Sequence, residues 1–167
     1  MNSSFKGSRK PLAAEFQFNG HKLFLIANHF NSKSGDKPLY GRYQPPINAS
    51  EKMRHIQAQI VHDFVARILE DEPDANVVVL GDLNDFQFSR TLEILKGDIL
   101  FNTIDLLLPN DQYTINYEGN SEVFDQILVS RNLLNKSLEP DIVHTNSGFA
   151  EGVSDHDPVL IRVFFPS

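Results

Sequence analysis

Strand-like and helix-like hydrophobic patterns alternate along the chain. Two apolar-rich runs, residues 12–18 and 22–29, flank Asn19-Gly20 and predict a β-hairpin, because both turn residues tolerate positive φ. Residues 23–27 of the second run are apolar at every position, which predicts a central strand covered on both faces. This segment is therefore expected to contribute two adjacent strands to a sheet.

A long loop and a long helix are predicted next. Residues 31–48 are polar and contain three prolines and two glycines. This segment is too long for a simple connection and is expected to be a functional surface loop. From about residue 50 to residue 70, apolar side chains recur at three- and four-residue steps, and Asn48 with Glu51 resembles a capping box. The predicted apolar stripe of this helix consists of Met53, Ile56, Ile60, Phe64 and Ile68.

Shorter runs complete an α/β pattern. Residues 77–80 predict a buried strand, and residues 89–96 predict a second helix. Further strands are predicted at 112–117, 123–130, 142–145 and 159–165, the first two paired around Glu118-Gly119-Asn120. Helices beside hairpins and crossovers favour an α/β layered sandwich, with mixed and antiparallel sheets packed by helices, over a purely parallel doubly wound sheet. Its core is expected to include Phe16, Phe18, Phe24, Phe64 and Phe164.

Composition narrows the class of protein. With 167 residues, 41% of them hydrophobic and 22% charged, the chain is expected to form one globular domain. The absence of cysteine excludes disulfides, thiolate metal sites and a cysteine nucleophile. A net charge of -7 argues against coating nucleic acid through bulk charge, but it is compatible with an enzyme that holds a divalent cation. No apolar stretch is long enough to span a bilayer, and residues 1–10 do not resemble a signal peptide.

Polar residues gather at four predicted strand ends. Asn28-His29 ends the second hairpin strand, Gly81-Asp82-Leu83-Asn84 follows the run 77–80, and Ser154-Asp155-His156-Asp157-Pro158 precedes the last apolar run. Asp125 interrupts an otherwise apolar strand, and a buried carboxylate must be paired, so His156 is its predicted partner. Each group alone also fits a structural interpretation, such as an Asx-rich turn or a half-buried histidine.

In order and spacing, these four segments resemble the endonuclease/exonuclease/phosphatase superfamily, whose fold is that of deoxyribonuclease I. The resemblance spans nearly the whole chain. The surrounding segments Arg9-Lys10-Pro11-Leu12 and 41–46 look most like secreted or membrane-associated bacterial nucleases. The resemblance therefore implies a hydrolase that acts on phosphodiesters, and an extracellular or periplasmic location for the parent protein.

Catalytic roles are implied by the same resemblance. Asp125 would fix the tautomer of His156, and this pair, together with Asp82, would activate or orient the attacking water. Asn84 would donate its amide to a phosphate oxygen. His29 would hydrogen-bond the phosphate or protonate the leaving oxygen.

Metal and substrate contacts are implied as well. Asp155 would ligate Mg²⁺ or Mn²⁺, with Ca²⁺ as a further candidate, since these cations prefer oxygen ligands. Arg9 would contact a backbone phosphate of the substrate. The expected substrate-binding residues are Arg9, Asn31, Arg42 and Asn84.

One departure from the family concerns the metal site. Relatives carry an early asparagine and a metal-binding glutamate in a segment that precedes the strand with His29, and Glu15 does not match that glutamate. Residues 1–167 are therefore expected to be one domain, the C-terminal portion of the family's domain, with doubtful activity alone. An uncovered sheet edge is expected to promote self-association.

Three classes of function stay open on the sequence. The first is a metal-dependent endonuclease that acts on DNA rather than RNA, and the second is a phosphoesterase for an inositol phosphate or a phospholipid such as sphingomyelin. The third is a truncated domain without catalysis. The loop 32–48 bears on the choice, because its basic and aromatic residues suit a polyanion, although they also fit a solvated loop. These residues are Lys33, Lys37, Tyr40, Arg42 and Tyr43.

Overall fold

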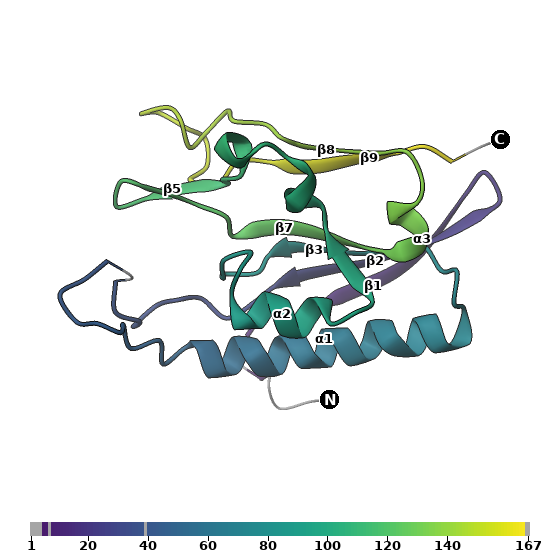
Figure 1. Ribbon diagram of the computed structural model, residues 1–167, viewed down its shortest axis with the longest axis horizontal. Helices are drawn as coiled ribbons and strands as arrows, with labels where there is room; N and C mark the ends of the chain where they lie inside the picture. The colour runs from purple at the N-terminus through teal and green to yellow at the C-terminus, as the bar shows by residue number, and fades with distance from the viewer. Residues whose placement is uncertain (1–4, 7, 39, 166–167) are drawn as a thin grey trace.

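The computed structural model describes residues 5–6, 8–38 and 40–165. Its centre is a five-stranded sheet of order β1-β2-β3-β7-β4, in which β2 and β3 are parallel and the other neighbours are antiparallel. Two helices cover one face of this sheet, and a two-stranded sheet covers part of the other (Figure 1). This arrangement confirms the predicted α/β layered sandwich.

The central sheet consists of β1 (Leu12–Phe18), β2 (His21–His29), β3 (Val77–Asp82), β7 (Asp125–Ser130) and β4 (Leu100–Asn102). The helices are α1 (Glu51–Asp71), α2 (Arg90–Lys96) and α3 (Arg131–Leu134), with 3-10 turns η2 (Thr103–Leu106) and η3 (Pro109–Asp111). Two small sheets are formed by β5 (Ile115–Tyr117) with β6 (Asn120–Glu122) and by β8 (Leu138–Ile142) with β9 (Val159–Val163). In the part of the chain described, no helix combines the length and apolar character needed to cross a membrane.

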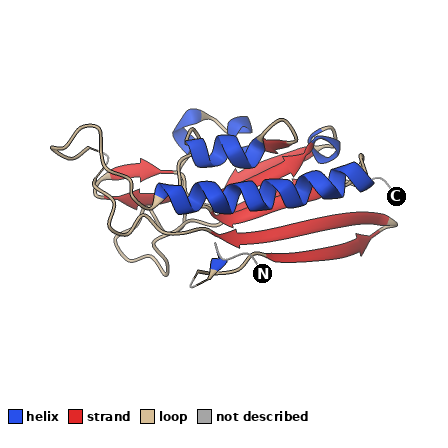
Figure 2. Cartoon of the chain, turned by 90° about the horizontal axis from the view of Figure 1, so that it is seen from below, coloured by secondary structure: helices blue, strands red, loops and turns tan. Residues whose placement is uncertain are grey.

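The first hairpin forms as predicted. Asn19 and Gly20 have φ values of 47° and 78°, so both turn residues are in the left-handed region that a two-residue hairpin requires. The strand β2 lies between β1 and β3, but only part of it is covered, because Leu23 and Leu25 remain half-buried. Among the described residues, β1 has no partner along its outer edge (Figure 2).

The helix α1 buries a different face from the one predicted. Its buried residues are Arg54, Gln57, Ala58, Val61 and Val65. This stripe lies one position round the helix from the predicted one, and Met53, Ile56 and Phe64 are exposed. Apolar periodicity gave the wrong face because two of the buried positions are polar residues with hydrogen-bond partners.

The predicted capping box is also absent. No side chain caps the first turn of α1, and the backbone amide of Glu51 bonds to the carbonyl of Asn48. Ser50 instead donates its backbone N–H to Asp36, with an N–O distance of 2.9 Å. The start of α1 is therefore tied to the long loop rather than capped by its own neighbours.

The expected phenylalanine core is mostly wrong. Phe16, Phe18, Phe64 and Phe164 are exposed, and only Phe24 packs against the core. One core lies between the central sheet and the helices, and a second lies between that sheet and β8–β9. Phe16 and Phe18 lie on the second face, where the ring of Phe18 contacts that of Phe165, but both side chains remain mostly exposed.

Two predicted strands begin or pair differently. The hairpin around Glu118 and Gly119 joins β5 to β6, whereas the apolar strand that follows, β7, pairs with β3 and β4. The strand expected at 142–145 lies earlier, at Leu138–Ile142. The long-range pairing of β7 with β3 matters most, because it brings Asp125 beside Asp82.

Candidate active site

Strand register places three of the predicted catalytic residues in one row. His29 of β2 is paired with Asp82 of β3, and Asp82 is paired with Asp125 of β7. Residues directly opposite each other on neighbouring strands project to the same face of a sheet. This face is the one that packs against β8 and β9, as the alternation with Leu25, Val78 and Ile127 shows.

The fourth predicted catalytic residue reaches the row from the loop before β9. His156 Nδ1 lies 2.5 Å from Asp125 Oδ2, so the predicted pair is present. The hydrogen bond to Asp125 raises the pKa of His156 above its ordinary value despite partial burial, and the charges of Asp82 and Asp155 act in the same direction. The imidazole is thereby oriented by a carboxylate, which is the arrangement that general acid–base catalysis requires.

His29 is held differently. Its Nε2 lies 3.1 Å from Asp82 Oδ2, and the guanidinium of Arg9 contacts the same nitrogen. Burial lowers the pKa of His29, and the positive charges of Arg9 and His156 add to this effect, against the opposing pull of the two aspartates. The two histidines of the site therefore have pKa values displaced in opposite directions, which suits separate acid and base roles.

We expect the two displacements to be visible by histidine NMR in the metal-free protein. His156 should titrate above its ordinary value of about 6.5 and His29 below it. Since the folded-state pKa of His156 is raised, the Asp125–His156 pair stabilises the fold fully below about pH 6.5, and this contribution is lost as pH rises through the folded-state pKa. In Asp125→Asn, the His156 pKa should fall toward the ordinary value. An unchanged pKa would contradict the assigned contact.

The turn after β3 sets the position of Asp82 and Asn84. Asp82 Oδ1 accepts the backbone N–H of Asn84 at 2.8 Å, and the Asn84 amide donates to Phe30 O at 3.1 Å and to Asp82 Oδ2 at 3.2 Å. Burial raises the pKa of Asp82, as does the charge of Asp125, although the bond from Asn84 opposes them. Asn84 is thus held rigidly beside the catalytic row.

Gly81 allows β3 to approach β2 closely at this point. Its φ is +128°, and a Cβ on Gly81 would lie 2.0 Å from the carbonyl oxygen of Asn28. We therefore expect Gly81→Ala to reduce the free energy of unfolding by about 3 kcal/mol or more, from backbone strain plus the steric clash. Gly20→Ala is the matched control, because Gly20 also has positive φ but has no atom within 4 Å of the added Cβ. Urea unfolding measures both, and equal losses would show that the contact with Asn28 is unimportant.

A cleft of about 760 Å³ opens beside the row. Asn84, Asp155 and His156 line it, together with loop residues 33–38, 40 and 41 and residues of the β5–β6 hairpin. Its lining residues are Lys33, Ser34, Gly35, Asp36, Lys37, Pro38, Tyr40, Gly41, Asn48, Asn84, Phe86, Ile115, Tyr117, Glu118, Asn120, Glu122, Phe124, Asp155 and His156. The cleft thus gives a ligand access to His156.

The expected substrate contacts are only partly assembled. Asn84 lines the cleft, but Arg9 lies against His29 and is not among the lining residues. Asn31 is used within the loop, where its amide donates to Ser32 O at 3.1 Å. Arg42 packs on Tyr43, with its guanidinium carbon 4.8 Å from the ring centre.

Asp155 is exposed and lines the cleft, as a metal ligand should. Within the described residues, no three or more histidine, aspartate or glutamate side chains converge as a metal site. Mg²⁺ in phosphoryl-transfer sites often binds through one or two carboxylates, substrate oxygens and water. Asp155 therefore fits one place in such a coordination shell.

Sequence reasoning assigned no role to Asp157, although it adjoins the catalytic histidine. Its buried carboxylate accepts backbone N–H groups of Asn146 and Ser147 at 2.8 and 3.0 Å, the Ser147 hydroxyl, and His144 Nδ1 at 3.1 Å. Burial alone would raise the pKa of Asp157, but these hydrogen bonds hold it well below its usual range. The carboxylate therefore anchors residues 144–147 next to His156. In the sequence, the feature that could have indicated a role for Asp157 is that an aspartate stands on each side of His156.

Two histidines and two aspartates therefore meet beside an open cleft, an arrangement suited to acid–base catalysis. A sequence profile of the Endonuclease/Exonuclease/phosphatase family matches residues 2–140, and the chain belongs to this family. The predicted family and its deoxyribonuclease I-like fold are both confirmed. Comparison with curated protein sequences gives no match.

Solved structures share the fold at low identity. Truncated TDP2 of Caenorhabditis elegans is 19% identical, with a TM-score of 0.68 over 93% of this chain and 60% of that one. Beta toxin of Staphylococcus aureus is 21% identical, with a TM-score of 0.57 over 90% of this chain and 55% of that one. A mannosyl-6-phosphatase of Bacteroides thetaiotaomicron is 16% identical, with a TM-score of 0.58 over 88% and 53%. The chain spans about 60% or less of the length of these proteins.

Proposed function

We propose that this chain carries the catalytic site of a metal-dependent phosphodiesterase that cleaves DNA endonucleolytically. The observation that carries the proposal is the 2.5 Å contact between His156 and Asp125, in a row with Asp82 and His29. Hydrolysis of a phosphodiester needs an activated water, neutralised phosphate oxygens and a proton for the leaving oxygen. The row and its surroundings contain a group suited to each task.

The proposed roles follow from the geometry. His156 takes the proton from the attacking water, since Asp125 stabilises the imidazolium that forms. His29 gives a proton to the leaving oxygen in its protonated form, which the charge of Asp82 favours although burial opposes it, and Asp82 also holds the ring. Asn84 donates an amide hydrogen to a non-bridging phosphate oxygen in place of its bond to Asp82. Asp155 would hold Mg²⁺ or Mn²⁺, which would supply charge neutralisation at the phosphate.

The loop side of the cleft supports DNA as the substrate. Lys33 and Lys37 line it and carry positive charge, and Tyr40 is exposed at its rim. Arg42 and Tyr43, stacked on each other, lie on the same loop. Positive charges beside exposed aromatic rings are suited to contact the backbone and bases of a nucleic acid strand.

A second candidate substrate is favoured by the opposite side of the cleft. Glu118 and Glu122 line it, and burial together with the charge of Glu118 raises the pKa of Glu122 against the influence of Lys33. Two carboxylates would repel a second phosphate of a polyanion. This side suits a phosphoester without further anionic groups, such as an inositol phosphate with a single phosphate or a phospholipid with a cationic choline headgroup.

A substrate panel tests the proposal. Supercoiled plasmid, RNA, sphingomyelin vesicles and an inositol phosphate are compared at equal Mg²⁺, with and without chelator. We expect the highest kcat/KM for the plasmid, and complete loss with chelator. Faster turnover of the lipid or the inositol phosphate would favour the second candidate substrate over DNA. No turnover of any substrate would favour a domain without catalysis.

We further propose that β1 mediates self-association. Leu12, Phe16 and Phe18 lie on one face of β1 and are 69%, 51% and 60% exposed. Among the described residues, the outer edge of the strand has no partner, and an apolar edge strand readily pairs with a second copy.

Light scattering after gel filtration should show a dimer or larger species for the parent chain. Phe16→Lys should shift the population to monomer, because a charge would be buried in the interface. Phe88→Lys is the control, since Phe88 is 70% exposed and lies outside β1. A parent chain that is monomeric at high concentration would rule out the association.

A further inference from the structure

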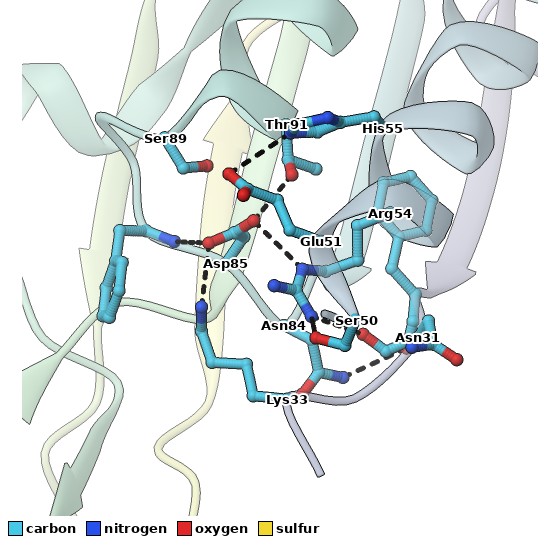
Figure 3. A network of polar contacts seen from close by, with 12 residues as sticks. Asn31, Lys33, Ser50, Glu51, Arg54, His55, Asn84, Asp85, Ser89 and Thr91 are labelled. Atoms are coloured by element: carbon cyan, nitrogen blue, oxygen red, sulfur yellow. Dashed lines mark hydrogen bonds and ion pairs between the residues drawn. The ribbon is translucent and has the colours of Figure 1, made fainter. Parts of the chain in front are cut away.

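Behind the loop side of the cleft lies a buried ion network that the proposed catalytic steps do not use (Figure 3). Its centre is Arg54 of α1, which is 0% exposed. Arg54 Nε donates to Asp85 Oδ2 at 3.0 Å, and Nη1 donates to Ser50 Oγ at 2.6 Å and to Asn31 O at 3.3 Å. A guanidinium so engaged fixes α1, the loop and the turn after β3 relative to one another.

Asp85 connects Arg54 to Lys33, which lines the cleft. Its Oδ2 also accepts the Thr91 hydroxyl at 2.6 Å, and its Oδ1 accepts Lys33 Nζ at 3.0 Å. Burial alone would raise the pKa of Asp85, but Lys33, Thr91 and Arg54 together hold it below its ordinary value. The carboxylate is therefore charged, and it is shared between a buried cation and one that reaches the cleft.

Lys33 is the member of the network that meets the cleft. Its side chain is 25% exposed, whereas the side chains of Arg54, Asp85 and Asp36 are 1%, 4% and 7% exposed. The ammonium also lies 4.4 Å from the centre of the Phe86 ring, a cation–π contact that further limits its movement. Asp85 is thus buried, and the network presents the ammonium of Lys33 to the cleft that also contains Asn84 and His156.

We propose that Lys33 binds a phosphate oxygen of the substrate, and that Arg54 is a positioning residue that holds Lys33 there through Asp85. The inference rests on the proposed function for the identity of the reaction, but not for the binding itself. A lysine ammonium binds phosphate as a point charge, so its position decides its effect. Arg54 has no exposed surface and cannot touch the substrate.

Metal-free binding tests the inference independently of turnover. The probe is a short oligothymidylate in chelator, and its affinity is measured by NMR titration at several salt concentrations. Lys33→Met should weaken binding roughly five- to tenfold and reduce the slope of log affinity against log salt by about one. Arg54→Met should weaken binding and reduce the salt slope to the same extent, although the buried Arg54 side chain does not contact the probe. Lys52→Met removes an exposed charge from the same helix and should leave the affinity within about twofold.

A double variant separates positioning from a purely structural role. Lys33→Met with Arg54→Met should bind no more weakly than Lys33→Met alone, because both changes remove the same contact. If Arg54→Met does not fold, Asp85→Asn takes its place, since it removes the carboxylate that holds Lys33. Unchanged affinity and salt slope in Arg54→Met or Asp85→Asn, or additive losses in the double variant, would overturn the inference. Absent hydrolysis with these binding effects intact would overturn the proposed function only.

Discussion

His156→Ala is expected to lower the rate of plasmid cleavage by about 10³-fold, within the 10²- to 10⁴-fold range of general acid–base catalysis. His156 is the residue of the cleft whose ring is oriented by a carboxylate, at 2.5 Å from Asp125. Its loss removes the group proposed to take the proton from water, while the rest of the row remains. The measurement is single-turnover nicking of supercoiled plasmid in Mg²⁺.

His55→Ala is the matched control for this experiment. His55 lies on α1, where it pairs with Glu51 at 3.4 Å, and it does not line the cleft. We expect its cleavage rate to stay within about twofold of the parent, in line with the absence of any contact to the reacting groups. Equal losses in the two variants would point to a general effect on folding. A His156→Ala rate equal to that of the parent would refute the assigned base.

Arg54→Met is expected to reduce the free energy of unfolding by about 3–5 kcal/mol, the range found when one partner of a buried ion pair is removed. The change leaves Asp85 and Asp36 buried without the guanidinium, which lies 3.0 and 3.6 Å from their oxygens. Lys33 compensates Asp85 only from the cleft side. Urea unfolding followed by circular dichroism gives the value.

Arg67→Met is the control on the same helix. Arg67 is exposed, and its Nε donates to Asp63 O at 3.3 Å, so we expect a change within about 0.5 kcal/mol. Combining Arg54→Met with Asp85→Asn should recover part of the loss, because the second change removes the unpaired charge. A loss no larger than that of Arg67→Met would mean that the buried network contributes little to stability.

Elementary chemistry applied to the sequence was enough to predict the hairpin and the pairing of Asp125 with His156. Asn19 and Gly20 both have the positive φ values that the turn requires. Asp125, a carboxylate in an apolar strand, is paired with His156 as expected. The turn depends on two neighbouring residues, and the pairing follows from the cost of burying an unpaired carboxylate. They could therefore be predicted without knowing how the strands pair.

Features set by long-range packing could not be predicted in this way. The buried face of α1 contains Arg54 and Gln57, whose polar atoms are satisfied by residues of the loop, so apolar periodicity indicated the neighbouring face. The pairing of β7 with β3 joins segments about 45 residues apart, and no local signal distinguishes it from a hairpin with β5. The exposed Phe16 and Phe18 have strand periodicity, but coverage of their face depends on other segments.

The connection between Lys33 and Arg54 likewise could not be predicted from the sequence. Lys33 appears in the sequence as one of several charges in a polar loop, and Arg54 as one of several on a helix. Their connection runs through Asp85, which lies 52 residues from Lys33 and 31 residues from Arg54. The fold creates this network, and it was visible only once the loop, α1 and the turn after β3 were in contact.

Metal-dependent nicking of plasmid DNA by the parent chain and by Asp125→Asn tests the central claim most directly. The substitution preserves the shape of the side chain but removes the charge that stabilises the His156 imidazolium. We predict nicking by the parent in Mg²⁺ that stops on chelation, and a rate lowered at least about 10²-fold in Asp125→Asn. Nicking that proceeds equally in the two proteins, or that continues in chelator, would contradict the proposed site.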